Sequence, residues 1–403
     1  MRILFLTDNF PPEVNAPASR TYEHCIEWVR RGVEVTVITC VPNFPQGKVF
    51  DNYKNKWRQK ETMDGIRVIR VWSYISANEG FGKRILDYVS FGVTSFLHGL
   101  FVKTDLIVAT SPQFFTAVSG RWLSLCKRKP WVMEVRDLWP ESIKAVSAMK
   151  SDNMIFSYLE WVEKRLYKSA KKIIVVTDAF RDKIASRGID KNKISVVKNG
   201  VLMEKFKPVE KNRQLLSQLG LEGKFIFGYL GTHGMAHKLD FIVECAAKIT
   251  DEDIHFLFIG NGAQKENVRN LAVQLRVKNC TFLDSVPKNE IADYISITDV
   301  ALVNLMKSET FQTVIPSKIF ENASMQKPIL LGVEGESKSI IEQYDAGICF
   351  EPENEAAFLD AVYRLKSDAQ LYGKLQEGCK RLALDFDRRK LALRMLEIFN
   401  QVT

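Results

Sequence analysis

Short apolar runs alternate with longer segments of mixed polarity along the whole chain. Each run has the length of a β-strand, and most lack regular polar alternation, which is typical of parallel strands buried on both faces. The intervening segments are long enough for helical crossovers, so the first half predicts a doubly wound α/β sheet. Its predicted strands are 2–7, 33–39, 66–72, 105–110, 131–135 and 172–177.

The same alternation restarts after residue 200. A polar, charge-rich join, "EKFKPVEKNRQ", separates the two halves, and 403 residues are too many for one ordinary core. We therefore expect two Rossmann-like domains, 1–200 and 201–403. The predicted strands of the second are 225–231, 255–260, 280–283, 299–305, 328–332 and 346–350.

One apolar segment, 85–102, competes with this picture because its length just reaches that of a membrane span. It contains Asp87 and His98, and a crossing there would separate the strand at 105–110 from its own sheet. A buried helix is the expectation. A helix partly exposed to lipid stays open as an alternative.

Charge divides unevenly between the halves. Residues 1–200 hold 32 Lys and Arg against 20 Asp and Glu, a net +12, whereas 201–403 hold 25 against 28, a net −3. The first half is therefore expected to meet something anionic, such as a membrane surface or a phosphate-bearing acceptor. No nucleic-acid motif is present. The seven cysteines are scattered without a CxxC pair, which favours neither a metal site nor a disulfide framework and suggests a reducing cytosol. The apolar run in "MRILFLTD" is too short for a signal peptide.

Candidate chemistry gathers in loops that follow predicted strands. The first strand leads into "TDNFPPEVNAPASR", where doubly wound folds bind ligands, but no GxGxxG supports a nicotinamide cofactor. In the second domain "GYLGTHGMAHKLD" and "IGNGAQ" place glycines and basic groups at the same sheet edge, which suits a diphosphate. An ordinary loop with incidental histidines is the alternative.

The segment "TVIPSKIFENASMQKPILLG" places Lys318 and Glu321 one turn apart at a loop-to-helix junction. In isolation the two residues would be an exposed i,i+3 ion pair. Beside the glycine loops they suggest more, because a carboxylate can accept two hydrogen bonds from a ribose diol and an ammonium can meet phosphate. The sequence therefore predicts a nucleotide-diphosphate site.

Six motifs follow one another along the chain: "FPPEVNAPASR", "MEVRDLWPES", "VVKNGV", "YLGTHGMAHKLD", "VIPSKIFENASMQKPILLGVEGES" and "AGICFEPEN". In this order and approximate spacing they resemble the family-4 glycosyltransferases of the GT-B fold, in which two Rossmann-like domains face each other across a cleft. The resemblance extends over essentially the whole chain, and the combination resembles one subgroup, the O-antigen and capsule enzymes similar to N-acetylfucosamine transferases.

The resemblance implies a retaining transfer from a nucleotide-diphosphate sugar, UDP-linked by expectation, without a cofactor or metal. It assigns acceptor binding to the first domain and donor binding to the second. The last helix, about 385–403, is expected to cross back to the first domain. The implied catalytic residues are Arg136, Asp137 and Lys318. The implied donor-binding residues are Asn15, Ala16, Gly231, Thr232, His233, Gly234, His237, Lys238, Gly260, Asn261, Gly262, Ser285, Val286, Thr313, Pro316, Ser317, Lys318 and Glu321.

Several positions depart from the family's pattern. Glu321 matches the second glutamate of its Glu-x7-Glu motif, but the first falls at Thr313. The family's diphosphate-binding arginine and lysine fall at Thr232 and His237, so the missing charge must come from elsewhere. The candidates are Lys238, His233 and Lys318. Arg136 stands where many members have a histidine, while Asp137 is kept.

The leading hypothesis is transfer of an N-acetylated deoxyhexosamine to a polyprenyl-diphosphate-linked saccharide in O-antigen or capsule biosynthesis. Two alternatives stay open: a nucleotide-sugar 2-epimerase of GT-B architecture, and a degenerate nucleotide-sugar-binding subunit. The lipid-linked acceptor predicts peripheral association with the inner face of the plasma membrane, through the basic first domain. In "MIFSYLEWVEKRLYKSAKK" (154–172), an apolar stripe with basic residues beyond it could contribute, or could simply pack on the sheet; the stripe is Ile155, Leu159, Val162 and Leu166.

Overall fold

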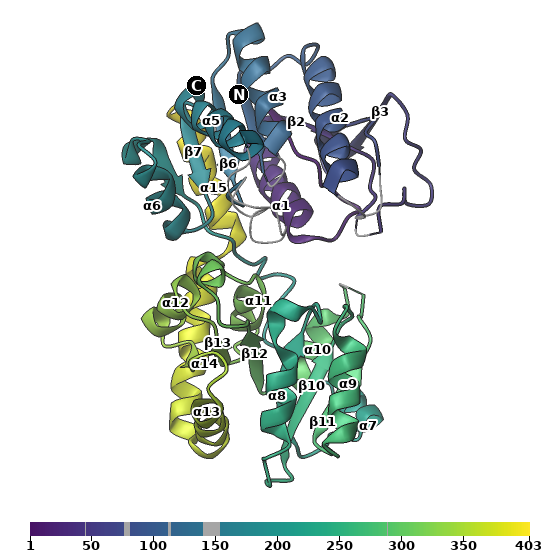
Figure 1. The fold of residues 1–403 in the computed structure, drawn as a ribbon, viewed down its shortest axis with the longest axis vertical. Helices are drawn as coiled ribbons and strands as arrows, with labels where there is room; N and C mark the ends of the chain where they lie inside the picture. Colours follow the sequence, from purple (N-terminus) through teal and green to yellow (C-terminus); the bar gives the residue numbers. More distant parts are fainter. Residues whose placement is uncertain (45, 76–80, 112–113, 140–153, 288) are drawn as a thin grey trace. The chain divides into compact units, whose positions relative to one another are not determined.

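The protein is described by a computed structural model of residues 1–403, except 45, 76–80, 112–113, 140–153 and 288 (Figure 1). It divides into two compact units: unit 1 is Met1–Asn199 with Arg388–Thr403, and unit 2 is Gly200–Asp387. The predicted boundary after residue 200 differs from this division by one residue. The C-terminal helix belongs to unit 1.

Unit 1 is built on an eight-stranded sheet with the order β3-β4-β2-β1-β5-β6-β7-β8. All described pairings are parallel except that of β3 with β4. Chain order reverses between β1 and β5, which creates a switch point at their carboxyl ends. The strands are β1 (Arg2–Leu6), β2 (Glu34–Thr39), β3 (Arg58–Met63), β4 (Ile66–Val71), β5 (Leu106–Thr110), β6 (Trp131–Val135), β7 (Lys172–Val175) and β8 (Ile194–Val196).

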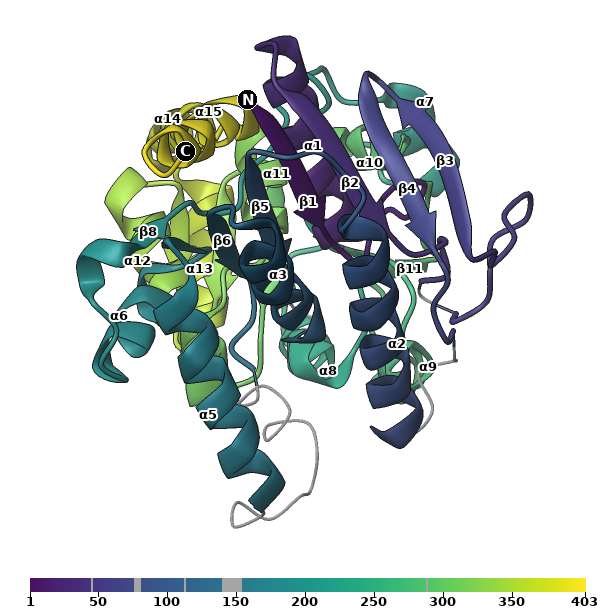
Figure 2. The same cartoon turned by 90° about the horizontal axis from the view of Figure 1, so that it is seen from above.

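Helices cover both faces of this sheet. Figure 2 shows α2, α3 and α5 side by side on one face, where they share a core with β5, β6 and β7. Helices α1 and α15 pack together on the other face, around the buried Trp28. The helices are α1 (Ala16–Arg30), α2 (Phe81–Gly99), α3 (Phe114–Lys127), α5 (Met154–Ser169), α6 (Asp178–Ser186), the short 3-10 helix η1 (Lys191–Lys193) and α15 (Arg388–Asn400).

The predicted strands of unit 1 all appear as strands, and two further strands were missed. β3 reads "RQKETM", and its side chains are exposed or half-buried because it lies at the sheet edge. An edge strand needs no apolar run, so hydrophobicity does not reveal it. β8 has only three residues.

The segment predicted at 85–102 forms most of α2. Phe91 is buried in the core beneath it. Among the described residues, no helix combines the length and apolarity that crossing a membrane requires.

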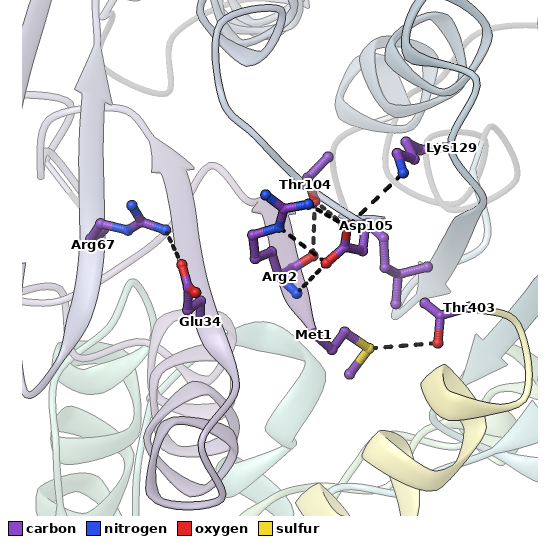
Figure 3. Close-up of polar contacts among 9 residues, drawn as sticks. Met1, Arg2, Glu34, Arg67, Thr104, Asp105, Lys129 and Thr403 are labelled. Carbon is purple, nitrogen blue, oxygen red and sulfur yellow. Dashed lines mark hydrogen bonds and ion pairs between the residues drawn. The ribbon is translucent and has the colours of Figure 1, made fainter.

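A polar cluster fixes the first strand at the amino-terminal edge of the unit 1 sheet (Figure 3). The Arg2 guanidinium donates from Nη2 to Asp105 Oδ1 at 2.7 Å and from Nε to Asp105 Oδ2 at 3.1 Å. Thr104 Oγ1 donates to the carbonyl of Arg2 at 3.0 Å. The bonds from Arg2 lower the pKa of Asp105 to about 2. These contacts join β1 to β5 at the edge opposite the switch point.

Unit 2 contains a six-stranded parallel sheet with the order β11-β10-β9-β12-β13-β14. Its switch point lies between β9 and β12. The strands are β9 (Phe225–Leu230), β10 (Ile254–Ile259), β11 (Cys280–Leu283), β12 (Val300–Asn304), β13 (Ile329–Gly332) and β14 (Gly347–Cys349). The helices are α7 (Arg213–Leu219), η2 (Met235–His237), α8 (Leu239–Ala246), α9 (Lys265–Gln274), α10 (Ile291–Ile297), η3 (Glu309–Thr313), α11 (Lys318–Ser324), α12 (Glu336–Tyr344), α13 (Glu355–Ser367) and α14 (Ala369–Asp385).

Candidate functional site

A pocket of about 580 Å³ lies in unit 2, beyond the carboxyl ends of β9, β10 and β11 and against the first turn of α11. Parallel sheets bind ligands at this edge. Four separate stretches of sequence meet there. Of the predicted donor-binding residues, those that line the pocket are Gly231, Thr232, His237, Gly260, Asn261, Ser285, Val286, Pro316, Ser317, Lys318 and Glu321.

Helix α11 presents Lys318 and Glu321 to this pocket because its other side is apolar. Ile319, Phe320 and Ala323 are buried in the core of unit 2. The interpretation of Lys318 and Glu321 as a solvent-exposed ion pair is therefore wrong: the Lys318 Nζ atom is buried, and both residues line the pocket.

The ammonium of Lys318 is the most unusual group in the pocket. Among the described residues it has no hydrogen-bond partner. It lies 3.8 Å from the centroid of the Tyr229 ring, a cation–π contact. Burial lowers the pKa of Lys318 to about 7, although the charge of nearby Glu321 raises it. A buried amine without an acceptor is suited to meet an anionic ligand.

Tyr229 is a site residue that the sequence did not reveal. Its side chain is fully buried at the end of β9, and its hydroxyl donates to the carbonyl of Thr232 at 2.7 Å. The rings of His233 and His237 each lie 5.7 Å from the Tyr229 ring. One aromatic ring thus positions Lys318 and the loop after β9. In sequence, Tyr229 looks like any other aromatic residue of a buried strand.

Two glycines allow the loops to approach each other. Gly231 has φ +148°, and a Cβ there would lie 2.8 Å from Lys318 Nζ. Gly260 has φ +147°, and a Cβ there would lie 1.8 Å from the carbonyl oxygen of Gly231. L-residues rarely adopt this backbone conformation; Gly260 has no room for a side chain, and a side chain at Gly231 would displace the Lys318 amine.

A network of polar side chains holds the loop that follows β10. Asn261 donates from Nδ2 to Ser285 Oγ at 3.0 Å. Lys265 donates to Asn261 Oδ1 at 3.0 Å and to Asp284 Oδ1 at 2.6 Å. The loops after β10 and β11 therefore form one wall of the pocket.

Neither His233, a candidate for the missing positive charge, nor His237 supplies that charge. His233 is buried beneath the loop and is not among the residues that line the pocket; burial lowers its pKa to about 4, with Lys265 and Lys318 contributing. His237 lines the pocket, but burial and Lys318 also lower its pKa to about 4. Both imidazoles are neutral at pH 7, because a buried cation beside other cations is costly.

Four other predicted positions lie outside the pocket lining. Lys238 pairs with Asp240 at 2.7 Å, so its charge is already compensated. Gly234 and Gly262 belong to the supporting loops. Thr313 ends η3, where its hydroxyl donates to the carbonyl of Thr310 at 3.1 Å. Of the predicted substitutes for the missing charge, Lys318 is the one that lines the pocket, with its Nζ atom buried against Tyr229.

The remaining predicted residues lie in unit 1 at its own switch point. Asn15 caps α1 by accepting from the backbone N–H of Ala18 at 2.8 Å, and Ala16 begins the helix. The backbone N–H groups of Arg136 and Asp137 donate to Ser111 Oγ at 2.8 and 3.3 Å. These residues thus gather at the carboxyl ends of β1, β5 and β6.

Arg136 lies in a buried group of charges. Arg20 and Glu134 form a buried ion pair at 3.0 Å. Arg136 donates from Nη1 to the carbonyl of Pro17 at 3.2 Å, while its Nε atom has no partner among the described residues. Burial lowers the pKa of Arg136 to about 10; Glu134 opposes the shift, and Arg20 and Arg388 add to it. In the described part of the chain, the arginines of this group (Arg20, Arg136 and Arg388) outnumber its carboxylates (Glu134 and Glu23), which suits a site for an anionic group.

Comparison with known proteins agrees with this architecture. The family model described as "Glycosyl transferase 4-like domain" matches residues 15–200, and that described as "Glycosyl transferases group 1" matches residues 212–381. A relative from Escherichia coli (strain K12), whose name assigns it to colanic acid biosynthesis as glycosyl transferase WcaI, is 24% identical over 374 residues, 90% of this chain and 91% of its own. The Pseudomonas aeruginosa protein named "Probable glycosyltransferase WbjE" is 24% identical over 230 residues, 56% of this chain and 57% of its own.

The fold has close counterparts among solved structures. The crystal structure of Anabaena Alr3699/HepE in complex with UDP superposes with a TM-score of 0.73 at 14% identity and covers 100% of both chains. Two units with parallel, Rossmann-like sheets, each matched by a glycosyltransferase family model, define a glycosyltransferase of the GT-B fold. Within that class, the chain belongs to glycosyltransferase family 4 and is related to enzymes of polysaccharide biosynthesis.

Proposed function

We propose that the chain transfers an N-acetylated deoxyhexosamine, with retention of configuration, from its UDP-linked donor to a lipid-linked saccharide in O-antigen or capsule biosynthesis. The observation that carries the donor half of this proposal is the buried, unpartnered Lys318 amine in the unit 2 pocket. The acceptor half is supported by the name of the colanic acid relative. The UDP in the HepE crystal structure supports uracil as the base.

In this proposal each charged residue of the pocket binds a different part of the donor. Lys318 would neutralise the diphosphate, whose negative charge grows as the bond to the sugar breaks. Glu321 would accept hydrogen bonds from the ribose hydroxyls. The leaving phosphate oxygen would take the proton of the acceptor hydroxyl, so the transfer needs positioning and charge but no resident metal. Arg136 and Asp137 would serve the acceptor side of the reaction.

An epimerase is less well supported by the same pocket. Inversion at carbon 2 of a donor sugar requires acid–base groups close to the anomeric centre. Glu321 is the one carboxylate among the described lining residues, and it is assigned to the ribose. A binding subunit without activity would have the same pocket, so turnover by the purified protein must decide between the two.

The proposed acceptor would require this activity to take place at the cytoplasmic face of the plasma membrane. A saccharide on polyprenyl diphosphate cannot leave the bilayer, so the enzyme must come to it. We therefore propose peripheral association through unit 1.

A thermal-shift screen of UDP, GDP and dTDP with their sugars tests the donor assignment. A ligand that binds only the folded state raises its melting temperature. We expect the largest shift with UDP or a UDP-sugar, followed by sugar transfer to a lipid-linked acceptor by the protein alone. No shift with any nucleotide would contradict the donor site, and binding without turnover would favour the inactive subunit.

A further inference from the structure

The outer surface of the α2, α3 and α5 layer of unit 1 is rich in exposed apolar side chains. These three helices lie side by side on one face of the sheet (Figure 2). Nine large apolar residues are exposed on them or directly after them, and together we call them the helix-layer surface: Leu86, Val93, Leu97, Phe101, Trp122, Leu125, Met154, Tyr158 and Trp161.

Helix α5 shows that this exposure is not required by the fold. Leu159, Val162 and Leu166 pack into the core, so the stripe predicted for a membrane is used for packing instead; the Ile155 side chain lies outside the described residues. The other side of the helix carries Tyr158 and Trp161, exposed by 62% and 51%. The fold gives no reason for aromatic residues there.

The exposed aromatic residues of α5 form an ordered group. The rings of Tyr158 and Trp161 stack with centroids 5.8 Å apart. The Arg165 guanidinium lies over the Trp161 ring, 4.2 Å from its centroid. With Met154 they follow spacings of four, three and four residues, which place them on one helix face.

Positive charge surrounds this surface. Lys164 and Lys168 are exposed on α5, and Lys83, Lys103 and Arg128 are exposed near the ends of α2 and α3. Glu160 is the one carboxylate that is exposed rather than buried or half-buried among the described residues of the three helices. The helix layer therefore exposes both apolar and basic side chains.

We propose that the helix-layer surface rests on an anionic membrane, with Tyr158 and Trp161 at the level of the lipid headgroups. Tyrosine and tryptophan favour the boundary between hydrocarbon and water, and lysine and arginine are attracted to anionic lipids. A protein partner fits less well, because lysine is depleted at protein interfaces. This inference rests on the proposed lipid-linked acceptor and assigns the surface by which unit 1 reaches it.

Vesicle flotation of the full chain tests the assignment with matched variants. The aromatic variant is Tyr158→Ala with Trp161→Ala, and its control is Tyr363→Ala, an exposed aromatic of α13 in unit 2. The charge variant is Lys164→Glu with Lys168→Glu. Its control, Arg31→Glu with Lys390→Glu, makes the same charge change next to α1 and on α15, which cover the opposite face of the sheet.

We expect wild type to bind vesicles of phosphatidylglycerol and phosphatidylcholine at low salt, not phosphatidylcholine alone, with binding fading as salt is added. Each helix-layer variant should bind at least about tenfold more weakly, because every basic residue and buried aromatic contributes to partition. Both controls should bind like wild type.

Three results would overturn the proposal. If wild type stays with the soluble fraction, both the proposed membrane-binding surface and the peripheral association are wrong. If the helix-layer variants bind like wild type, the assignment of the surface is wrong while peripheral association stands. Self-association without vesicles, abolished by the same variants, would make the surface a protein interface. UDP binding, measured by calorimetry on the same preparations, reports separately on the proposed donor site.

Discussion

Among single residues, Lys318 is the one on which the proposed donor site depends most. In this chain the charge expected at Thr232 and His237 is absent, and a buried lysine on a different element lies in the same pocket. Tyr229 stabilises the cation by its ring face, and Glu321 by its charge. The free-energy cost of burying the amine is thus offset in part before any ligand binds.

The depressed pKa of Lys318 predicts pH-dependent donor binding. Its pKa is about 7 in the empty pocket, so the amine is largely neutral at pH 8.5. A diphosphate binds the protonated form, so binding a UDP-sugar should take up a proton above pH 7, and affinity should fall by up to about tenfold per pH unit. Calorimetry in buffers of different ionisation enthalpy measures this uptake.

The control for this pH dependence is Lys318→Ala, which should bind the UDP-sugar weakly and without proton uptake. A UDP-sugar is the appropriate ligand, because its diphosphate has no terminal group that titrates near pH 6. If wild type and Lys318→Ala bind with the same pH dependence, Lys318 does not meet the diphosphate.

At the scale of elements, the site depends on how closely the β9 and β10 loops approach α11. Gly231 lies under the Lys318 amine, and Gly260 lies against the Gly231 carbonyl. Because glycine has no side chain, backbone atoms alone form the pocket wall at these two positions.

Gly231→Ala should therefore affect both stability and binding. A φ near +148° costs an L-residue about 1–3 kcal/mol, and the new methyl group would push against Lys318 Nζ. We expect a lower denaturation midpoint and loss of UDP affinity. Gly234→Ala is the matched control from the same loop, because its φ is −100° and a Cβ there has only ordinary contacts at 3.8 Å. Equal effects of the two substitutions would argue against the close packing of Gly231 on Lys318.

The sequence predicted much of this arrangement and missed the rest for identifiable reasons. Buried parallel strands have continuous apolar runs, so twelve strands were found, while the polar edge strand β3 was not. Lys318 and Glu321 were predicted to lie beside the glycine loops because a parallel sheet brings all its carboxyl ends to one edge, and both residues line the pocket there. Tyr229 and the neutral state of His233 depend on burial by residues far apart in sequence, which no local pattern reports.

At the scale of the whole molecule, the chain crosses between its units twice, and both crossings are anchored on α1. Arg20 donates to the carbonyls of Val197 and Lys198 at 2.9 and 2.8 Å, just before the first crossing. Arg388, directly after the second, bonds to Glu23. The charge group around Arg136 shares these residues, so the proposed acceptor side of the reaction is built where the chain leaves and re-enters unit 1.

Substitution of Arg136 should separate turnover from donor binding. Arg136→Ala removes a cation from unit 1 while the donor pocket lies in unit 2, so kcat should fall at least tenfold with UDP affinity unchanged. Steady-state kinetics and calorimetry measure the two quantities. Normal turnover in a folded variant would mean that Arg136 only supports the Glu134 ion pair.

In the proposed donor site, unit 2 holds a nucleoside diphosphate with Glu321 at the ribose and Lys318 at the phosphates. Calorimetric titration of uridine and UDP into wild type, Glu321→Ala and Lys318→Ala measures both assignments. Glu321→Ala should weaken both ligands by about 1.5–3 kcal/mol, the range for hydrogen bonds to a charged group. Lys318→Ala should weaken UDP while uridine keeps its affinity. Equal losses of uridine and UDP in Lys318→Ala, or unchanged affinities in Glu321→Ala, would contradict the account.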